Sequence, residues 1–428
     1  MVDITEARWL EEAPPLPGPL CPSWVALWRE GWALHQRSCR APIGMLDDIW
    51  ISAGQGYHVP AFGHWDIVHS VLDILSYDPA LAARQIRLVV RTLRRTDGRL
   101  PGLVRVLAND HGQEELVPDY QYSPPPLWPT AVLPIYHALR DTKFLKIAYE
   151  GAGKCLRWYE ENRRLPGGLF WFGDCVGDRQ WESGYDDCPR WDGLEGRVKP
   201  LACADLCGQM GMCYESMAAI ADLLGSADEA ATWRGHYERL AGLVRNTLWH
   251  DDDGLFYDRD TETGGWVRVK TVACFWPMVA GQATAAQVDR LVEHLGNREE
   301  FLADVPVPSV ALDDPTFSYD MWRGPTWLSQ TYWVMRGLLR YGCKELAGRI
   351  GTAALAGAAA SLEKNGAILE FHHPSGGSIG ELTRKGDACG PRRNYIGHNP
   401  VHAMALMLAD DCPQANAIGR MRASEPAP

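Results

Sequence analysis

The feature of this sequence that most limits its fold is the pairing of apolar helical segments across very short turns. HWDIVHSVLDIL places five apolar residues on one stripe: Ile67, Val68, Val71, Leu72 and Leu75. Asp78 and Pro79 then begin a second helix through LAARQIRLVVRTLRR. Similar pairs occur at residues 128–164, 203–249 and 327–366, and a last helix follows Pro400. The pattern predicts a mostly α-helical chain made of hairpins of about 35 to 50 residues.

The connections between these hairpins are unequal, because tight turns alternate with long loops. The hairpins share no repeated sequence pattern, which argues against an open solenoid. We therefore expect a closed ring of inner and outer helices, an all-α (α/α)6 barrel with long loops over one end, where function is expected. Strand signals are few, chiefly GLFWFG and GLFYDRD. The predicted long loops are residues 45–66, 97–128, 164–202, 303–327 and 364–399.

The domain organisation expected from this pattern is a single catalytic domain over residues 1–428. A Pro-rich lead-in occupies residues 1–22, and a short disordered tail is expected at 420–428. The N-terminal segment has acids and prolines where a signal peptide needs a basic and then an apolar stretch.

Charge and cysteine usage exclude several classes of protein. The 42 Lys plus Arg against 54 Asp plus Glu give a formal charge of −12, with no cluster of cations to neutralise phosphates, so we expect no nucleic-acid partner. No apolar run reaches the roughly 18 residues of a membrane span, so no membrane partner is expected either. The 12 cysteines are spread singly, which predicts reduced thiols and a cytoplasmic location. Cys203, Cys207 and Cys213 form the one tight cluster and are interpreted as helix-packing residues, so no metal or cofactor is predicted.

Acidic residues and tryptophans are concentrated in WESGYDDCPRWDG, residues 181–193. Tryptophan is used 18 times against 9 phenylalanines, and its flat apolar face suits a wall on which a sugar ring can stack. Carboxyls flanked by aromatic rings are what glycoside cleavage requires. The alternative is structural: Asp186, Asp187 and Asp192 cap helices or pair with Arg190, and the sequence leaves both interpretations open.

Inverting hydrolysis needs a second carboxylate across the sugar, about 6.5 to 9.5 Å from the first, to leave room for a water. NGAILEFHHPSGGSIGE offers Glu370, which follows a strand-like apolar step and precedes a Gly-rich loop. Glu381 is the competing choice. A barrel would bring this loop to the same mouth as Asp186.

The acidic segment WESGYDDCPRWD resembles the corresponding segment of the mannosylglycerate and glucosylglycerate hydrolases in glycoside hydrolase family 63, and more distantly that of trehalases. The similarity continues in order over residues 45–410, through GHWDIVHSVLDIL, YDPALAARQIRLVV, TDGRLPG, SPPPLWPTAVLPIY, DGLFYDRDTETG, FWPMVAG, VPSVALDDP and YDMWRGPTWLSQTYWVMRGL. Because many ordered segments match, the resemblance is more specific than any one motif.

The resemblance implies an (α/α)6 barrel and hydrolysis of an α-glycosidic bond with inversion, without a cofactor. It assigns Asp186 as the general acid and Glu370 as the general base. The implied substrate is a small glucoside or mannoside: glucosylglycerate, mannosylglycerate, glucosylglycerol or an α-linked disaccharide. The candidate substrate-binding residues are Trp65, Asp66, Trp181, Asp187, Trp191, Trp322, Arg323 and Trp327. The sequence gives no indication of the oligomeric state.

Departures from the family pattern leave the exact substrate open. Cys188 stands where the family usually has Ser, His372 and His373 follow the expected base, and NYIGHNPVHAM replaces the usual segment near the end. An acidic aglycone would need cations, for which the nearest candidates are Arg384, Lys385, Arg392 and Arg393; these could equally form a solvated basic loop.

Two other functions remain as alternatives. The histidines His64, His372, His373 and His398 would suit a sugar epimerase on the same barrel, with two His or a His and a Glu moving one proton. A carbohydrate-binding homologue with altered catalysis is the other alternative, although both candidate carboxyls are present.

Overall fold

The computed structural model describes residues 13–18, 20–53, 59–176, 181–194 and 199–409. It is mostly helical, as predicted. The helices are α2 (Val25–Ser38), α3 (His64–Ile74), α4 (Pro79–Thr92), α5 (Val132–Leu139), α6 (Thr142–Asn162), α7 (Ala204–Leu223), α8 (Ala227–Thr247), α9 (Trp276–Val279), α10 (Ala285–Gly296), α11 (Leu328–Arg340), α12 (Lys344–Asn365) and α13 (Val401–Leu408). Residues 1–12 and 19 of the expected lead-in, and the expected tail at 420–428, lie outside the described residues.

The predicted helical hairpins are confirmed at α3/α4, α5/α6, α7/α8 and α11/α12, and α13 follows Pro400 as expected. Local chemistry fixes their ends. The Asp78 carboxylate accepts a hydrogen bond from Leu81 N at 2.8 Å and Pro79 begins α4. Asp141 caps α6 in the same way through Phe144 N at 2.9 Å. The helices α2, α9 and α10 were not predicted.

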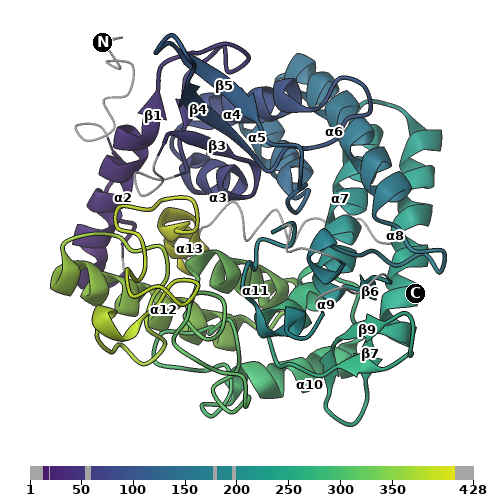
Figure 1. Ribbon diagram of the computed structural model, residues 1–428, viewed down its shortest axis with the longest axis vertical. Coiled ribbons are helices and arrows are strands. Elements are labelled where there is room, and N and C mark those ends of the chain that lie inside the picture. The colour runs from purple at the N-terminus through teal and green to yellow at the C-terminus, as the bar shows by residue number, and fades with distance from the viewer. Residues whose placement is uncertain (1–12, 19, 54–58, 177–180, 195–198, 410–428) are drawn as a thin grey trace.

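The helix pairs are arranged around a common centre (Figure 1). Helix α3 packs on α4, α4 on α5 and α6, α6 on α7, α7 on α8 and α9, α9 on α11, α11 on α12, and α12 on α13. Helix α13 packs in turn against α3 and α2, so the series of contacts returns to its start. Segments from the two ends of the chain are therefore neighbours.

Short antiparallel strands cover part of one end of this arrangement. The largest pairing joins β3 (Ala61–Gly63) to β4 (Leu103–Ala108) and β4 to β5 (Glu114–Pro118), with Val104 opposite Pro118. The interpretation of residues 97–128 as only a loop was therefore wrong. Alternating buried positions in LVRVLA and the NDHG turn make a hairpin there. The remaining strands are β1 (Cys39–Arg40), β2 (Trp50–Ile51), β6 (Leu201–Ala202), β7 (Trp249–His250), β8 (Leu255–Phe256), β9 (Asp258–Asp260) and β10 (Trp266–Val267).

Of the two predicted strand signals, GLFYDRD forms β8 and β9, whereas GLFWFG, which lies wholly within the described residues, forms no strand. Phe170 makes an isolated bridge with Arg164, and a 3-10 turn, η3 (Gly173–Cys175), follows. Among the described residues, none of the helices has the length and apolar character that crossing a membrane requires.

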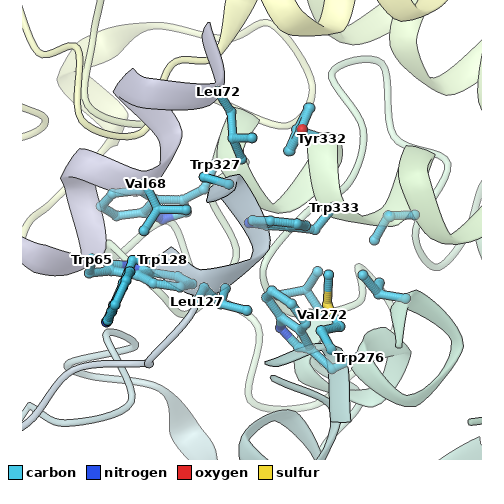
Figure 2. Close-up of a cluster of buried hydrophobic side chains, with 14 of the residues drawn as sticks. Trp65, Val68, Leu72, Leu127, Trp128, Val272, Trp276, Trp327, Tyr332 and Trp333 are labelled. Carbon is cyan, nitrogen blue, oxygen red and sulfur yellow. The ribbon is translucent and has the colours of Figure 1, made fainter. Parts of the chain in front are cut away.

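A cluster of buried apolar side chains brings together residues from several helices and the segments between them (Figure 2). Trp65 and Val68 come from α3, Trp128 from the 3-10 turn η2 (Trp128–Ala131), Trp276 from α9 and Trp333 from α11. All of these side chains are buried. Since Trp65 and Trp327 also face the cavity described below, this cluster forms the floor of the candidate site.

Candidate active site

A cavity of about 240 Å³ opens above the tryptophan cluster, where loops from distant parts of the chain meet. Seven of the ten predicted site residues line it: Trp65, Asp66, Trp181, Asp186, Trp322, Trp327 and Glu370. Asp186 and Glu370 lie 184 positions apart in the sequence and reach one cavity because the ring brings their loops together.

Asp186 is held at the cavity by anchored residues on either side. The Tyr185 hydroxyl donates to Gln330 Oε1 at 2.6 Å and accepts from Trp276 Nε1 at 2.8 Å, which fixes the loop to α11 and α9. On the other side, Asp187 Oδ1 accepts from Trp322 N at 3.0 Å. The side chain of Asp186 keeps 20% exposure and lies 2.6 Å from Lys385 Nζ.

Two further buried carboxyls shape the start of the same loop. Glu182 accepts from Arg163 Nε at 2.7 Å and from Gly173 N at 2.6 Å, so its charge is paired and hydrogen-bonded. Asp174 accepts from Ser183 N at 2.9 Å and from the Ser183 hydroxyl at 3.1 Å. Burial raises the pKa of Asp174 to about 7. The hydrogen bond from Ser183 N lowers this pKa, and the nearby charge of Glu182 raises it further.

Glu370 lies in the segment that follows α12 and is almost fully buried, at 2% exposure. Its backbone N–H donates to Arg392 O at 2.8 Å, and the neighbouring Leu369 forms a bridge with Arg393. The carboxylate accepts from Arg384 Nε at 3.0 Å and from Arg392 N at 3.1 Å. The Glu370 carboxylate therefore has one cationic partner and one backbone donor.

Asp66, at the start of α3, lines the cavity together with polar side chains and two stacked tryptophan rings. Tyr395 donates its hydroxyl hydrogen to Asp66, and His398 Nε2 lies 3.7 Å from the same carboxylate. Burial raises the pKa of Asp66 to about 6, and the Tyr395 hydrogen bond partly offsets that rise. Trp322 and Trp327 stack with centroids 3.8 Å apart. An apolar face next to hydroxyl-binding groups is the arrangement that a sugar ring requires.

Three predicted substrate-binding residues, Asp187, Trp191 and Arg323, are not among the residues that line the cavity. Trp191 is buried and donates from Nε1 to Tyr185 O at 3.2 Å. Arg323 donates to the backbone oxygen of Asp187 at 3.0 Å and to Asp192 at 3.0 Å. These contacts hold the Asp186 loop in place rather than facing the cavity.

The candidate histidines, Glu381 and Cys188 also differ in whether they line the cavity. Of the candidate histidines His64, His372, His373 and His398, all of which the structure describes, His398 alone lines the cavity, which does not support the two-histidine form of the epimerase alternative. The form with one histidine and one glutamate has both groups in the cavity, His398 and Glu370. His64 is buried against Thr92, with Nε2 2.6 Å from its hydroxyl, and burial lowers its pKa to about 3. Glu381 faces away from the cavity, with its side chain 55% exposed and one oxygen 2.6 Å from Ser378 N. Cys188 is buried.

Among the four candidate cations, Arg384, Lys385 and Arg392 line the cavity, whereas Arg393 donates to the backbone oxygen of Asn365. The sequence interpretation missed Arg105, Tyr122 and Tyr395, which also line it. Tyr395 lies in NYIGHNPVHAM, and its pairing with Asp66 bridges 329 positions of sequence, which no local pattern reports.

In the part of the chain that the structure describes, two buried groups have the composition of metal ligands. Cys203 lies with Asp205 and Asp258, and His35 lies with Asp73 and His402. Asp205 and Asp258 are both paired with the buried Arg190, whose guanidinium already supplies their positive partner. The interpretation of Cys203, Cys207 and Cys213 as packing residues agrees with their complete burial.

The ring of helices and its aromatic, carboxyl-bearing cavity have the character of a glycoside hydrolase, and comparison with known proteins defines the family. Residues 60–395 match the model of the mannosylglycerate hydrolase MGH1-like glycoside hydrolase domain. The chain therefore belongs to this family, and the predicted relation to glycoside hydrolase family 63 is confirmed.

Relatives in this family share part of the sequence. Mannosylglycerate hydrolase MGH1 of Selaginella moellendorffii is 32% identical over 180 residues, which are 41% of this chain and 35% of that protein. Mannosylglycerate hydrolase of Thermus thermophilus is 32% identical over 147 residues, 32% of this chain and 33% of that protein. These alignments span about a third of the length of the curated relatives.

The fold similarity covers more of the chain. The crystal structure of a GH63 mannosylglycerate hydrolase from Thermus thermophilus in complex with glucose has a TM-score of 0.68, with 22% sequence identity, 88% of this chain and 98% of that chain covered. This similarity establishes a shared fold.

Proposed function

We propose that this chain is a glycosidase that hydrolyses a small α-glycoside with inversion of the anomeric centre. The observation that carries this proposal is one cavity that brings Asp186 and Glu370 together between tryptophan faces. Asp186 protonates the departing oxygen, while Glu370 takes a proton from the water that attacks the anomeric carbon. Trp65, Asp66, Trp181, Trp322 and Trp327 contact the substrate, and no metal or nucleotide takes part.

The proposed architecture is a single (α/α)6 barrel domain in which the long loops build the site. Support comes from the closed series of helix contacts and from the fold shared with the Thermus enzyme. A cavity of about 240 Å³ is smaller than the roughly 300–1,000 Å³ typical of sites for drug-sized ligands. It suits a short glycoside rather than a polymer. Because the named relatives are mannosylglycerate hydrolases, glycosides of glycerate are the first substrates to consider.

The test is a substrate panel of glucosylglycerate, mannosylglycerate, glucosylglycerol, trehalose and kojibiose, followed by proton NMR in the first minutes of reaction. We expect turnover of at least one member, in excess chelator, with the β-anomer as the first-formed sugar. For the glycosides of glycerate or glycerol, an α-anomer as first product would mean retention and contradict the proposed mechanism. With trehalose, inversion releases one β-glucose and one α-glucose, whereas retention releases α-glucose alone. Failure to hydrolyse any α-glycoside would contradict the proposed function itself.

A further inference from the structure

The hairpin of residues 384–387 places one cation on each of the two proposed catalytic carboxyls. Arg384 and Asp387 exchange backbone hydrogen bonds of 2.9 and 3.1 Å, and Gly386 N donates to Asp320 Oδ2 at 2.9 Å. At its tip, Lys385 has φ +55°, a left-handed conformation that is uncommon for a residue with a side chain. Arg384 reaches Glu370 and Lys385 reaches Asp186.

These two ion pairs have opposite consequences for the proposed reaction. A general base must be ionised, and the guanidinium of Arg384 stabilises that form of Glu370. A general acid must carry a proton, and an ammonium 2.6 Å from a carboxylate oxygen of Asp186 stabilises the charged form instead. The contact with Lys385 therefore opposes the protonated form that the proposed acid requires.

The two pairs also differ in how readily they separate. The side chains of Arg384 and Glu370 are 16% and 2% exposed, and Arg392 N adds a second donor to Glu370. The side chains of Lys385 and Asp186 are 36% and 20% exposed, so water replaces either partner at a smaller desolvation cost. The ammonium also lies 4.8 Å from the centroid of the Trp181 ring, which is 45% exposed at the cavity edge. Lys385 therefore contacts both the proposed general acid and an exposed ring of the cavity lining.

We propose that Lys385 is a specificity-determining residue that keeps Asp186 charged until an anionic aglycone draws the ammonium away. This inference rests on the proposed function, since it requires Asp186 to be the general acid. The acid protonates the departing oxygen, so a carboxylate on a short aglycone lies within reach of Lys385. A neutral aglycone offers no such group, and a bulky sugar aglycone competes with the ammonium for the face of Trp181.

The proton balance of this cycle closes without any other reactant. When Lys385 pairs with the aglycone anion, Asp186 takes one proton from solvent. That proton passes to the glycosidic oxygen as its bond to the anomeric carbon breaks. The attacking water forms the new carbon–oxygen bond and gives one proton to Glu370, which returns it to solvent after the products leave.

The other charged groups around Asp186 agree with this role for Lys385. The negative charge of Asp186 repels three nearby carboxyls, those of Asp66, Asp174 and Asp187, and it also raises the pKa of Tyr122. The cation Arg105 also lines the cavity but is paired with Asp119 at 3.0 Å. These like charges favour the protonated form of Asp186, whereas the contact with Lys385 favours the charged form.

The direct test measures the proton affinity of Asp186 without using activity. Carbon-13 NMR titration of the side-chain carboxyls, with Asp186 assigned by Asp186→Asn, compares the wild type with Lys385→Met. We expect the titration midpoint of Asp186 to rise by about one pH unit in Lys385→Met, a tenfold change in proton affinity. Saturating glycerate should raise the titration midpoint of Asp186 in the wild type and leave it unchanged in Lys385→Met.

The matched control Lys344→Met, at an exposed lysine at the start of α12, should behave as the wild type. Equal midpoints in all three proteins would overturn the inference.

A kinetic test separates this inference from the proposed function. Glucosylglycerate and glucosylglycerol share the sugar and differ in the charge of the aglycone, and a glycosyl fluoride needs little acid assistance. In Lys385→Met we expect kcat/KM to fall 10- to 100-fold for the anionic substrate, to rise several-fold at pH 7 for the neutral one, and to stay level for the fluoride.

An equal loss for both glycosides would mean that Lys385 only binds or folds, and the inference would be wrong. If Asp186→Asn left the glycosides and the fluoride equally active, Asp186 would not be the acid and the proposed function would fail whatever Lys385 does.

Discussion

At the scale of single residues, the two proposed catalytic carboxyls have different surroundings. Glu370 is buried and held by Arg384 and the backbone of Arg392, whereas the Asp186 side chain is 20% exposed and lies 2.6 Å from Lys385 Nζ. The first suits a group that stays ionised and activates water whichever group leaves. The second suits a group whose protonation changes during the reaction.

This difference predicts an asymmetry between two variants. Asp186→Asn should slow hydrolysis of glycerate and sugar leaving groups by about 10² to 10⁴-fold, yet affect a glycosyl fluoride only slightly, because fluoride departs without a proton. Glu370→Gln should depress all substrates alike. Steady-state kinetics on both substrate types measure this. The control Glu381→Gln, outside the cavity, should retain most activity. If Glu381→Gln abolished turnover and Glu370→Gln did not, the base would be Glu381.

A second prediction concerns the buried Asp174. Its pKa of about 7 in the folded protein exceeds the unfolded value of about 3.8, so the folded state binds this proton more tightly. The contribution of Asp174 to stability is thus fully present below about pH 4 and is lost as the pH rises toward 7. Asp174→Asn should therefore gain stability relative to the wild type between these pH values, by a total on the order of 2 to 4 kcal/mol.

Urea unfolding of both proteins at a series of pH values from 4 to 8 measures this difference. Asp289→Asn, at an exposed position on α10, serves as the control and should follow the wild type. A stability difference that is independent of pH would show that Asp174 is ionised in the folded protein throughout this range.

At the scale of secondary-structure elements, the sequence predicted those helices whose apolar stripe and end signals agree. Asp78 and Pro79 begin α4 and Gly225 ends the turn after α7, where its φ is +78°. Helix α10 was missed although its signal was present: Thr284 and Gln287 form a capping box, with hydrogen bonds of 3.2 and 2.9 Å. The hairpin β4–β5 was missed because its outer strand has no buried position and its burial does not alternate along the strand.

The site was predictable only in part, for a physical reason. Residue types within two separate segments indicated Asp186 and Glu370 as candidates, and the family resemblance added Trp65, Trp322 and Trp327. The pairing of Lys385 with Asp186 joins positions 199 apart and depends on where the ring closes. The roles of Trp191 and Arg323 in holding the loop depend equally on contacts that no local pattern encodes.

The capping box of α10 gives a prediction for a single element. Thr284→Ala removes the side-chain oxygen that accepts from Gln287 N, so one N–H at the helix start loses its partner. We expect a loss of about 1 kcal/mol in the free energy of unfolding, with kcat/KM unchanged. The control is Thr232→Ala, an exposed threonine within α8 whose hydroxyl donates to the backbone oxygen of Asp228 one turn earlier. Equal destabilisation by both variants, measured by urea unfolding, would contradict a capping role.

At the scale of the whole molecule, the ring is closed by contacts between its first and last helices. Asp73 on α3 is the centre of this closure. Its carboxylate accepts from His35 on α2 at 2.8 Å, from His402 on α13 at 2.6 Å and from Ala403 N at 2.8 Å. All three side chains are completely buried, and Trp32 stacks on His402 with centroids 3.7 Å apart. One carboxylate thus ties together parts of the chain that lie more than 300 positions apart.

The contacts of Asp73 lie close to the candidate site, because the segment that leads into α13 also lines the cavity. His398 and Tyr395 line the cavity and directly precede α13, and His69 on α3 bonds to Gly397 O at 3.0 Å. A ring that opened at Asp73 would release the segment that carries these side chains. Closure of the fold and assembly of the site are therefore expected to be coupled.

The last prediction tests this coupling with Asp73→Ala. The substitution leaves two buried histidines and one backbone N–H without their acceptor, which should cost about 3 to 5 kcal/mol of unfolding free energy. Because α2, α3 and α13 meet at this residue, the loss should move one cooperative transition, followed by tryptophan fluorescence and by activity, to lower urea concentration. Asp110→Asn, at an exposed turn between β4 and β5, should leave the transition in place. Should activity disappear at a lower urea concentration than fluorescence, α13 would detach as a separate unit, and a single closed domain would be the wrong description of this protein.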